Sequence, residues 1–315
     1  MKIVDLKKEH LVKAEELIRL CYQEESAYVD ALPTCVDDFH LSSFAENDFS
    51  AAAFERDELV GVLCSYPPFE NAFGSTCVKG IFSPMGANAA VKDNREKIYA
   101  AMYQTVAQKW VNAGALSHAI CLYAHDEPLQ REFYRLGFGL RCLDAIRKME
   151  EIKAPSLEGY TFMELPEGDS GKIYPLFSLL NLHYEKSPFF MNREKQSKDD
   201  FLKFIQDEST RFFVAFAHGE ICAYYEVANS GETCICDDEK YLHICGAYCL
   251  PEHRGKGVAQ NLLNYMINTL KTEGYTRIGV DFESINPTAY GFWMKYFTPY
   301  THSVVRRIDE NGKNF

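Results

Sequence analysis

Two glycines in residues 251–259 have the spacing to build a binding site for phosphate groups. The run follows the apolar residues 244–250 and precedes apolar residues at helical spacing, so a strand, a tight turn and a helix are expected. Gly255 and Gly257 let the backbone fold closely, because no Cβ stands in the way. The first amides of the helix lack partners within it and lie at the positive end of its dipole. They therefore suit a phosphate or pyrophosphate.

The same run fits the [QR]-x-x-G-x-[GA] signature of the GNAT acetyltransferases, with Arg254, Gly257 and Ala259 at the defined positions. Downstream, residues 286–295 read NPTAYGFWMK and resemble the N-x-x-A-x-x-F-Y-x-K segment of that family. Both signatures occur in the family's order. A P-loop fits poorly because no Ser or Thr follows Lys256, and a dinucleotide-binding fold would carry its glycines near the start of the domain.

The resemblance implies acetyl-coenzyme A as co-substrate and an α/β fold with a mixed sheet. It places the backbones of Cys249 and Leu250 against the pantetheine arm and the thioester, and Asn286 further along the cofactor. The residues that it implies for the pyrophosphate are Arg254, Gly255, Lys256, Gly257, Val258 and Ala259.

Landmarks in the two halves of the chain keep a nearly constant offset, which predicts duplication of one α/β domain. Residues 133–138 (FYRLGF) also resemble, more weakly, the F-Y-x-K-x-G-F ending of the GNAT domain. We therefore expect two tandem GNAT-like acyl-CoA N-acyltransferase domains, residues 1–154 and 155–315, joined by a linker at 150–159. The offsets are 165 − 6 = 159 for Leu6 and Leu165, 274 − 114 = 160 for Gly114 and Gly274, and 292 − 133 = 159 for Phe133 and Phe292.

The first half lacks the glycine turn. After an expected strand at 78–82 it reads SPMGAN, and its helix is expected to begin in a capping box at residues 93–96. Without the glycines there is no equivalent cradle for a pyrophosphate. We interpret the first domain as a degenerate, non-catalytic copy that packs against the second and shapes the acceptor pocket; the alternative is a second live site.

Family members transfer the acetyl group directly to an amine in a ternary complex. The amine must lose a proton, because the pKa of a lysine-like amine is ~10.4. Asp281 and Glu283 share one face at the carboxyl end of an expected strand, where α/β sheets place ligands. Glu283 is the first candidate for the base, or for a group that holds a cationic amine, and Glu226 on a neighbouring hairpin is the second. The alternative is that these are solvated strand-end charges.

The departing thiolate needs a proton, which the family takes from the tyrosine of F-Y-x-K. Trp293 stands at that position, and an indole has no proton to give at a useful pKa. Tyr290, Tyr296 or water could replace it; the alternative is that each tyrosine only packs in the core. The missing tyrosine keeps open an alternative function, a non-catalytic acyl-CoA binding or regulatory module.

Composition narrows the protein class. The net charge of −12 disfavours a nucleic-acid partner and is compatible with a cationic acceptor. No run approaches the ~20 apolar residues of a membrane span, and no signal peptide is evident, so a cytoplasmic protein is expected. The acceptor is expected to be a small-molecule or peptide amine, and the sequence leaves the oligomeric state open.

Cysteines and a histidine cluster between residues 234 and 249, but they do not have the spacing of a metal site. No C-x-x-C pair occurs there, and two of the cysteines fall in an apolar strand. Eleven cysteines in all, mostly in apolar runs, indicate buried free thiols. No metal is expected, and direct transfer requires no cysteine nucleophile.

Overall fold

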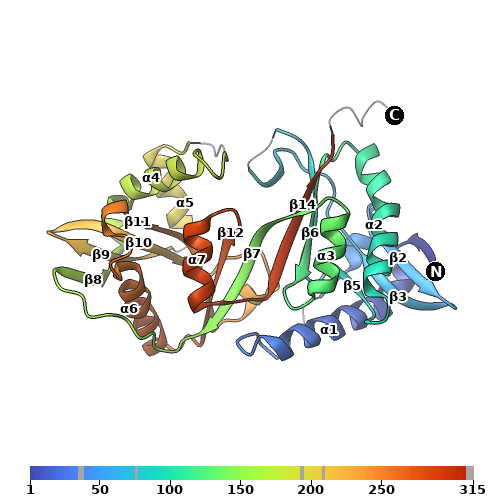
Figure 1. Cartoon of the computed structure of the whole chain (residues 1–315), viewed down its shortest axis with the longest axis horizontal. Coiled ribbons are helices and arrows are strands. Elements are labelled where there is room, and N and C mark those ends of the chain that lie inside the picture. Colours follow the sequence, from blue (N-terminus) through green and yellow to red (C-terminus); the bar gives the residue numbers. More distant parts are fainter. Residues whose placement is uncertain (35–38, 75–76, 192–194, 208–209, 310–315) are drawn as a thin grey trace. The chain divides into compact units, whose positions relative to one another are not determined.

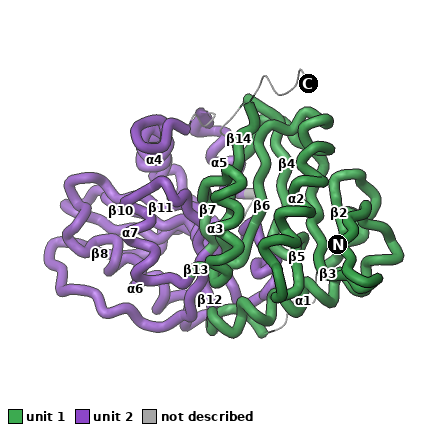
Figure 2. Tube along the Cα trace, turned by 45° about the vertical axis from the view of Figure 1, so that its right-hand side comes forward, with its two compact units in different colours: residues 1–144, 299–315 green, residues 145–298 purple. Residues whose placement is uncertain are grey.

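The structure is a computed structural model, and it forms two compact units (Figure 2). Unit 1 contains Met1–Asp144 and Pro299–Phe315, and unit 2 contains Ala145–Thr298. The two copies proposed from the sequence, 1–154 and 155–315, thus differ from the compact units mainly at the C-terminal end, which joins unit 1. The residues that the structure describes are 1–34, 39–74, 77–191, 195–207 and 210–309.

Unit 1 holds two groups of hydrogen-bonded strands. The first group is antiparallel, and its order is β1 (Lys2–Asp5), β2 (Ala51–Glu55), β3 (Glu58–Leu63) and β5 (Asn88–Ala90). The second group has the order β4 (Gly80–Ser83), β6 (Ser117–Tyr123), β14 (Thr301–Arg307) and β7 (Gly139–Lys148), with β4 parallel to β6.

The helices of unit 1 are α1 (Leu11–Tyr28), α2 (Arg95–Asn112) and α3 (Glu127–Arg135) (Figure 1). Their apolar faces and the strands build one core, in which Trp110, Tyr103 and Phe133 are almost completely buried. The expected capping box at residues 93–96 is wrong. The N-cap residue of α2 is Asn94, in the left-handed conformation with φ 57°, and its side chain caps nothing.

Unit 2 is a mixed sheet with helices on both faces. Its strand order is the end of β7, β12 (Arg277–Glu283), β11 (Tyr241–Cys249), β10 (Glu220–Ala228), β9 (Arg211–Ala217) and β8 (Tyr160–Glu164). Strands β11 and β12 are parallel, whereas β8 to β11 pair antiparallel.

Alternation along β9 sends neighbouring side chains to opposite faces of this sheet. Phe212 and Val214 pack with α4 (Tyr174–Tyr184) and α5 (Lys198–Asp207) on one face. Phe213 meets Tyr265 of α6 (Val258–Thr272) on the other, with ring centroids 6.4 Å apart. The apolar stripe of α6 is buried as its spacing predicts, and α7 (Pro287–Tyr296) follows β12.

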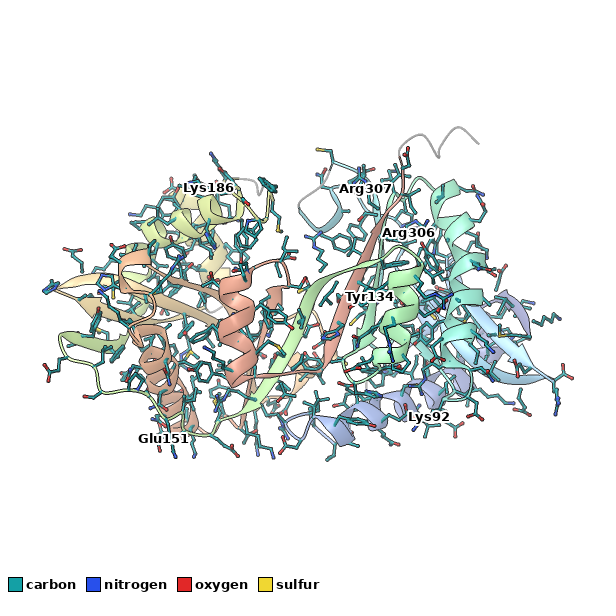
Figure 3. The ribbon with its side chains drawn as sticks, viewed as in Figure 1. Lys92, Tyr134, Glu151, Lys186, Arg306 and Arg307 are labelled. Carbon is teal, nitrogen blue, oxygen red and sulfur yellow. The ribbon has the colours of Figure 1, made fainter. Side chains whose placement is uncertain are left out.

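The segment between β7 and β8, expected to be a linker, carries no helix or strand and lies along α6 within unit 2 (its Glu151 is labelled in Figure 3). Asn264 Oδ1 accepts from the amide of Ile152 at 2.8 Å, and Gln260 Nε2 donates to the Lys153 carbonyl at 2.6 Å. Asn261 donates to the Pro155 carbonyl at 3.1 Å. These bonds fix the segment beside the start of α6.

Candidate active site

Strands β11 and β12 begin as partners and then separate. Their parallel pairing runs from Tyr241 to Ile244 on β11, although β11 continues to Cys249 and β12 to Glu283. Over its second half β11 pairs with β10 alone. A gap therefore opens between the carboxyl ends of two parallel strands, where open α/β sheets bind ligands.

A β-bulge accompanies this separation. Glu226 pairs with Gly246 but Val227 pairs with Ile244, so Cys245 is an extra residue without a Cα partner on β10. Bulges bend a strand and redirect its side chains. Here the bend begins where β11 leaves β12.

A cavity of about 420 Å³ occupies this region of unit 2. It is lined by the second half of β11, the following turn, the start of α6, the end of β12, α7 and one side of α4. The sequence-predicted cofactor residues that line it are Cys249, Arg254, Gly255, Gly257, Val258, Ala259 and Asn286. Leu250 and Lys256 do not contribute to the lining.

Residues 254–259 form the expected cradle. Gly255 and Gly257 have φ angles of 73° and 88°, which side-chain-bearing residues rarely adopt. The amide of Asn261 donates to the Gly257 carbonyl at 3.0 Å, so the amides of 258–260 precede the helical bonding of α6. Gly257 is also sterically confined, because a Cβ there would lie 2.6 Å from Cγ of Pro155. The cradle thus fits a pyrophosphate.

The two basic residues of the cradle lie differently. Arg254 is held in the cavity wall, where Nε donates to the Cys249 carbonyl at 2.8 Å and the guanidinium lies 5.2 Å from the Tyr248 ring centroid. Lys256 is exposed and does not line the cavity. Arg254 is therefore the better placed of the two to face an anionic ligand in the cavity.

Backbone donors for a thioester come from β11. The Leu250 amide donates to the Cys222 carbonyl on β10 at 2.9 Å, so it is already engaged. Because amides alternate in direction along a strand, those of Ala247 and Cys249 point toward the β12 side. The Cys249 amide thus keeps the predicted role of donor open to a ligand, whereas the Leu250 amide is bonded within the sheet.

Two carboxylates of β12 line the cavity, and a third, on β10, lies just behind the lining. Asp281 and Glu283 line it, and the Oε2 atom of Glu283 is buried. Glu226 is 6% exposed and lies just behind the lining, with Oε2 only 2.6 Å from the position that a Cβ on Gly246 would take. Burial raises the pKa of the Glu226 carboxyl to about 7.

The candidates for the general acid differ in whether they line the cavity. Tyr296 lines the cavity, and burial raises its pKa although nearby Arg147 lowers it. Tyr290 is 39% exposed outside the lining and packs against Phe282. Trp293 lines the cavity as a buried aromatic residue.

Asn286 is both a cavity residue and a helix cap. Its Oδ1 accepts from the amide of Ala289 at 3.0 Å, which fixes the start of α7. The side chain is 7% exposed and lines the cavity beside the end of β12. Its side-chain nitrogen takes no part in this cap bond and is the group that can donate to a ligand in the cavity.

Comparison with known proteins agrees with this geometry. Residues 178–297 match the model of the acetyltransferase (GNAT) family. These residues form a GNAT domain. They include the lining of the cavity just described, from α4 to α7. No protein of curated function matches the chain in sequence.

Solved structures extend the GNAT likeness to both halves of the chain. A GCN5-related N-acetyltransferase from Sphaerobacter thermophilus superposes with a TM-score of 0.59 at 11% identity, covering 97% of this chain and 95% of that one. A tandem GNAT protein from the clavulanic acid biosynthesis pathway gives 0.50 at 12% identity, covering 97% and 98%. At such identities the likeness concerns the fold. The chain therefore has the predicted tandem GNAT fold.

A third similar structure belongs to a longer protein, of which this chain matches only a part. It is a GCN5-related glucosamine N-acetyltransferase region in a fungal multi-domain β-N-acetylglucosaminidase, with a TM-score of 0.55 at 11% identity. It matches over 96% of this chain but 38% of that chain. This likeness again concerns the fold, and it is consistent with two GNAT-like copies in one chain.

The GNAT domain also has a wall that the sequence did not reveal. Leu180, His183 and Tyr184 of α4 line the cavity together with Tyr224 of β10. Burial lowers the pKa of His183, and the charge of Arg254 adds to this. The alternation of Tyr224 and Glu226 on one face of β10 was a signal for that wall, but nothing local connects it to α4.

Cysteine and metal chemistry receive no support from the geometry. Cys245 lines the cavity, and burial raises its pKa to about 12, with the Glu226 and Asp281 carboxylates adding to the effect. Its thiol is therefore neutral. Across the described ranges, no group of His, Cys, Asp and Glu side chains is arranged to hold a metal ion.

No helix among the residues that the structure describes is long and apolar enough to cross a bilayer.

Proposed function

We propose that the GNAT domain of unit 2 is an N-acetyltransferase, which transfers the acetyl group of acetyl-coenzyme A directly to a primary amine. The observation that carries the proposal is the single cavity in which a glycine cradle, two separated parallel strands and strand-end carboxylates meet. The acceptor is a small molecule or a peptide, and on the sequence evidence we place the protein in the cytoplasm.

In this proposal the cradle binds the pyrophosphate of the cofactor. The amides at the start of α6 donate to the phosphate oxygens, and Arg254 compensates their charge. The amides of Ala247 and Cys249 lie two residues apart on one strand edge, so one of them donates to the thioester carbonyl, where negative charge develops during attack, and the other to the pantetheine arm. The cofactor supplies the activated acetyl group.

Glu283 receives the proton of the acceptor amine, directly or through a water. It lines the cavity at the end of β12, opposite the separated part of β11. A carboxylate at this place can also hold an ammonium before the proton leaves. General-base catalysis of this kind contributes about 10²–10⁴-fold to a rate.

Tyr296 is the proposed donor to the departing sulfur, because it is the candidate acid that lines the cavity. Water is the alternative donor. A thiol with a pKa near ~8.5 leaves readily enough that the acid accelerates the step without being indispensable.

Trp293 favours a second candidate function, an acyl-coenzyme A binding module without turnover. The indole replaces the family's tyrosine and is buried against Tyr225 and Phe297. Such a module would use the same cradle and cavity. The two candidates differ only in whether an amine is acetylated.

Thiol release from acetyl-coenzyme A across a panel of primary amines separates the two functions. We expect release that depends on one class of amine, with the acetylated product identified by mass spectrometry. Tight acetyl-coenzyme A binding without release for any amine would instead establish the binding module.

A further inference from the structure

One end of the GNAT cavity is both aromatic and acidic. Tyr184 of α4, Tyr224 of β10 and Tyr248 of β11 line it, and the carboxylates of Glu226 and Asp281 lie on the same side of the sheet. We call these five residues the acidic end. Cys245 of the β-bulge lies near both carboxylates, since the charges of both act on its thiol.

Glu226 is a buried acid without a counter-charge. It forms no hydrogen bond or ion pair with the residues that the structure describes, and burial is the cause of its raised pKa. Gly246 leaves the space that its carboxylate occupies. A buried carboxylate is costly unless something neutralises it, so this one favours a cation in the adjacent cavity.

Asp281 is held in position by two buried side chains. His243 is 3% exposed, and its Nε2 lies 2.9 Å from Oδ1 of Asp281. The Tyr241 hydroxyl lies 2.7 Å from the other ring nitrogen, Nδ1. When Tyr241 donates to Nδ1, Nε2–H is the group that donates to Asp281, so the buried pair orients this carboxylate.

Tyr224 supplies an independent sign of a ligand. Its ring lines the cavity and the residue is 0% exposed, yet its hydroxyl has no hydrogen-bond partner among the described residues. Buried hydroxyls are normally satisfied. A bound ammonium could donate to this oxygen while the neighbouring tyrosine rings surround the charge.

Resting on the proposed function, we infer that the acceptor carries a second cationic group besides the amine that is acetylated, and that the acidic end binds it. The acceptor class is therefore a diamine or polyamine. Glu283 lies at the reacting amine, whereas Glu226 and Asp281 select the distal ammonium. Glu226 is then a specificity-determining residue.

Matched acceptors test this inference. A series of linear diamines is compared with straight-chain monoamines and amino alcohols of the same length. For the diamine of best length we expect kcat/KM to exceed that of its matched monoamine by about tenfold or more, the effect of one hydrogen bond to a charged group. Equal values for all matched pairs would overturn the inference while leaving the acetyltransferase intact.

The variant Glu226→Gln keeps the shape of the side chain and removes its charge. We expect it to reduce kcat/KM for the diamine about tenfold more than for the matched monoamine. An equal reduction for both acceptors would show that Glu226 serves the transfer itself, and would overturn the assignment. Glu220→Gln is the control, because Glu220 is exposed at the other end of the same strand.

A binding measurement keeps the inference testable if no amine is acetylated. Calorimetric titration of the diamine and the monoamine into the protein with coenzyme A should still show tighter binding of the diamine, weakened by Glu226→Gln and by Tyr224→Phe. If the protein binds the diamine more tightly but acetylates no amine, the proposed function is rejected and the role of the acidic end is supported. No preference in binding would reject the acidic end.

Discussion

In both units the residue just before the helix, its N-cap, has the left-handed conformation; in unit 2 this residue belongs to the glycine turn. It is Asn94 in unit 1, with φ 57°, and Gly257 in unit 2, with φ 88°. In unit 2 the preceding turn carries a further glycine and leaves the cradle open. In unit 1 the turn reads Val-Lys-Asp-Asn without a glycine, and its Lys92 is exposed (labelled in Figure 3).

At the offset of 160 residues, Arg95 of α2 corresponds to Gly255, which lines the cavity of unit 2. Its Nε donates to the Ala90 carbonyl at the end of β5 at 3.0 Å, and its two terminal nitrogens pair with Asp126 at 2.9 Å and Glu24 at 2.7 Å. Asp126 caps α3 as Asn286 caps α7. The guanidinium therefore ties together the strand end and the helix cap between which unit 2 leaves its cavity.

Strands β6 and β12, which follow these helices in the two units, also differ in the residues that a ligand would need. β6 and β12 begin 277 − 117 = 160 residues apart, and α3 and α7 begin 287 − 127 = 160 apart. At this offset Cys121 and Tyr123 correspond to Asp281 and Glu283. Unit 1 has therefore kept the order of elements but lacks both the cradle and the carboxylates. We propose that the ion pairs of Arg95 with Asp126 and Glu24, called the plug from here on, fill the site of unit 1 in place of a ligand.

The largest expected effect concerns the strand-end carboxylate. Glu283→Gln should lower kcat by about 10²–10⁴-fold near neutral pH without changing acetyl-coenzyme A affinity, because the acceptor loses its base. The loss should shrink at high pH, where more of the amine is already neutral. Steady-state kinetics across pH measures this, with Tyr123→Phe in unit 1 as the matched control. A raised acceptor KM with kcat retained would instead assign Glu283 to holding a cationic amine.

Sequence patterns predicted the elements of both units well because their signals are local. The apolar stripe of α6 and the glycines of its cradle identify themselves within a few residues, and the structure confirms the helix from Val258 to Thr272. The partners of Arg95 could not be predicted in this way. Glu24 lies 71 residues away from it and Asp126 lies 31 away, and only the tertiary fold brings them together.

The C-terminal strand shows the same limit. β14 ends the second copy in sequence, yet it pairs antiparallel with β6 in unit 1 over Thr301–Arg307. Its own pattern specifies a strand but does not choose its neighbour. The wall of α4 and the buried Glu226 likewise depend on contacts across the sheet, so the acceptor side of the site was less predictable than the cofactor side.

Copying the network of unit 1 into unit 2 should close the cavity. At the offset of 160 residues between the two units, Arg95 corresponds to Gly255 and Asp126 to Asn286, so Gly255→Arg combined with Asn286→Asp supplies both charges of the plug. We expect acetyl-coenzyme A affinity to fall by about 10³-fold, equivalent to about 4 kcal/mol. Calorimetry measures this, with Asn286→Asp alone and circular dichroism as controls. Unchanged affinity in a folded double variant would refute the correspondence.

Opening the plug of unit 1 should cost stability. Arg95→Ala leaves Asp126 and Glu24 unpaired in a largely buried place, and removing one partner of a buried pair costs about 3–5 kcal/mol. Urea unfolding followed by Trp110 fluorescence in a Trp293→Phe background reports unit 1 alone, since Trp110 is its buried tryptophan. Arg135→Ala is the control, because its pair with Glu132 is exposed on the Arg135 side and is worth about 0–1 kcal/mol.

A smaller effect distinguishes the buried acid of unit 2. The pKa of Glu226 is about 7 in the fold against 4.5 for the free group, so the native state keeps a proton that the unfolded state releases. Stability should therefore fall as pH rises from about 4.5 to about 7, by about 3 kcal/mol in total. Trp293 fluorescence in a Trp110→Phe background measures this for unit 2. Glu226→Gln should remove the slope; an unchanged slope would assign it to other groups.

The contrast between a plugged and an open site is tested most directly by calorimetric titration of acetyl-coenzyme A into the intact chain. The account predicts one site per chain, lost when the plug is copied into unit 2 and still one when Arg95→Ala opens the plug of unit 1, because no glycine cradle lies there. Two equivalent sites in the unmodified protein, or one site that survives Gly255→Arg with Asn286→Asp, would contradict it.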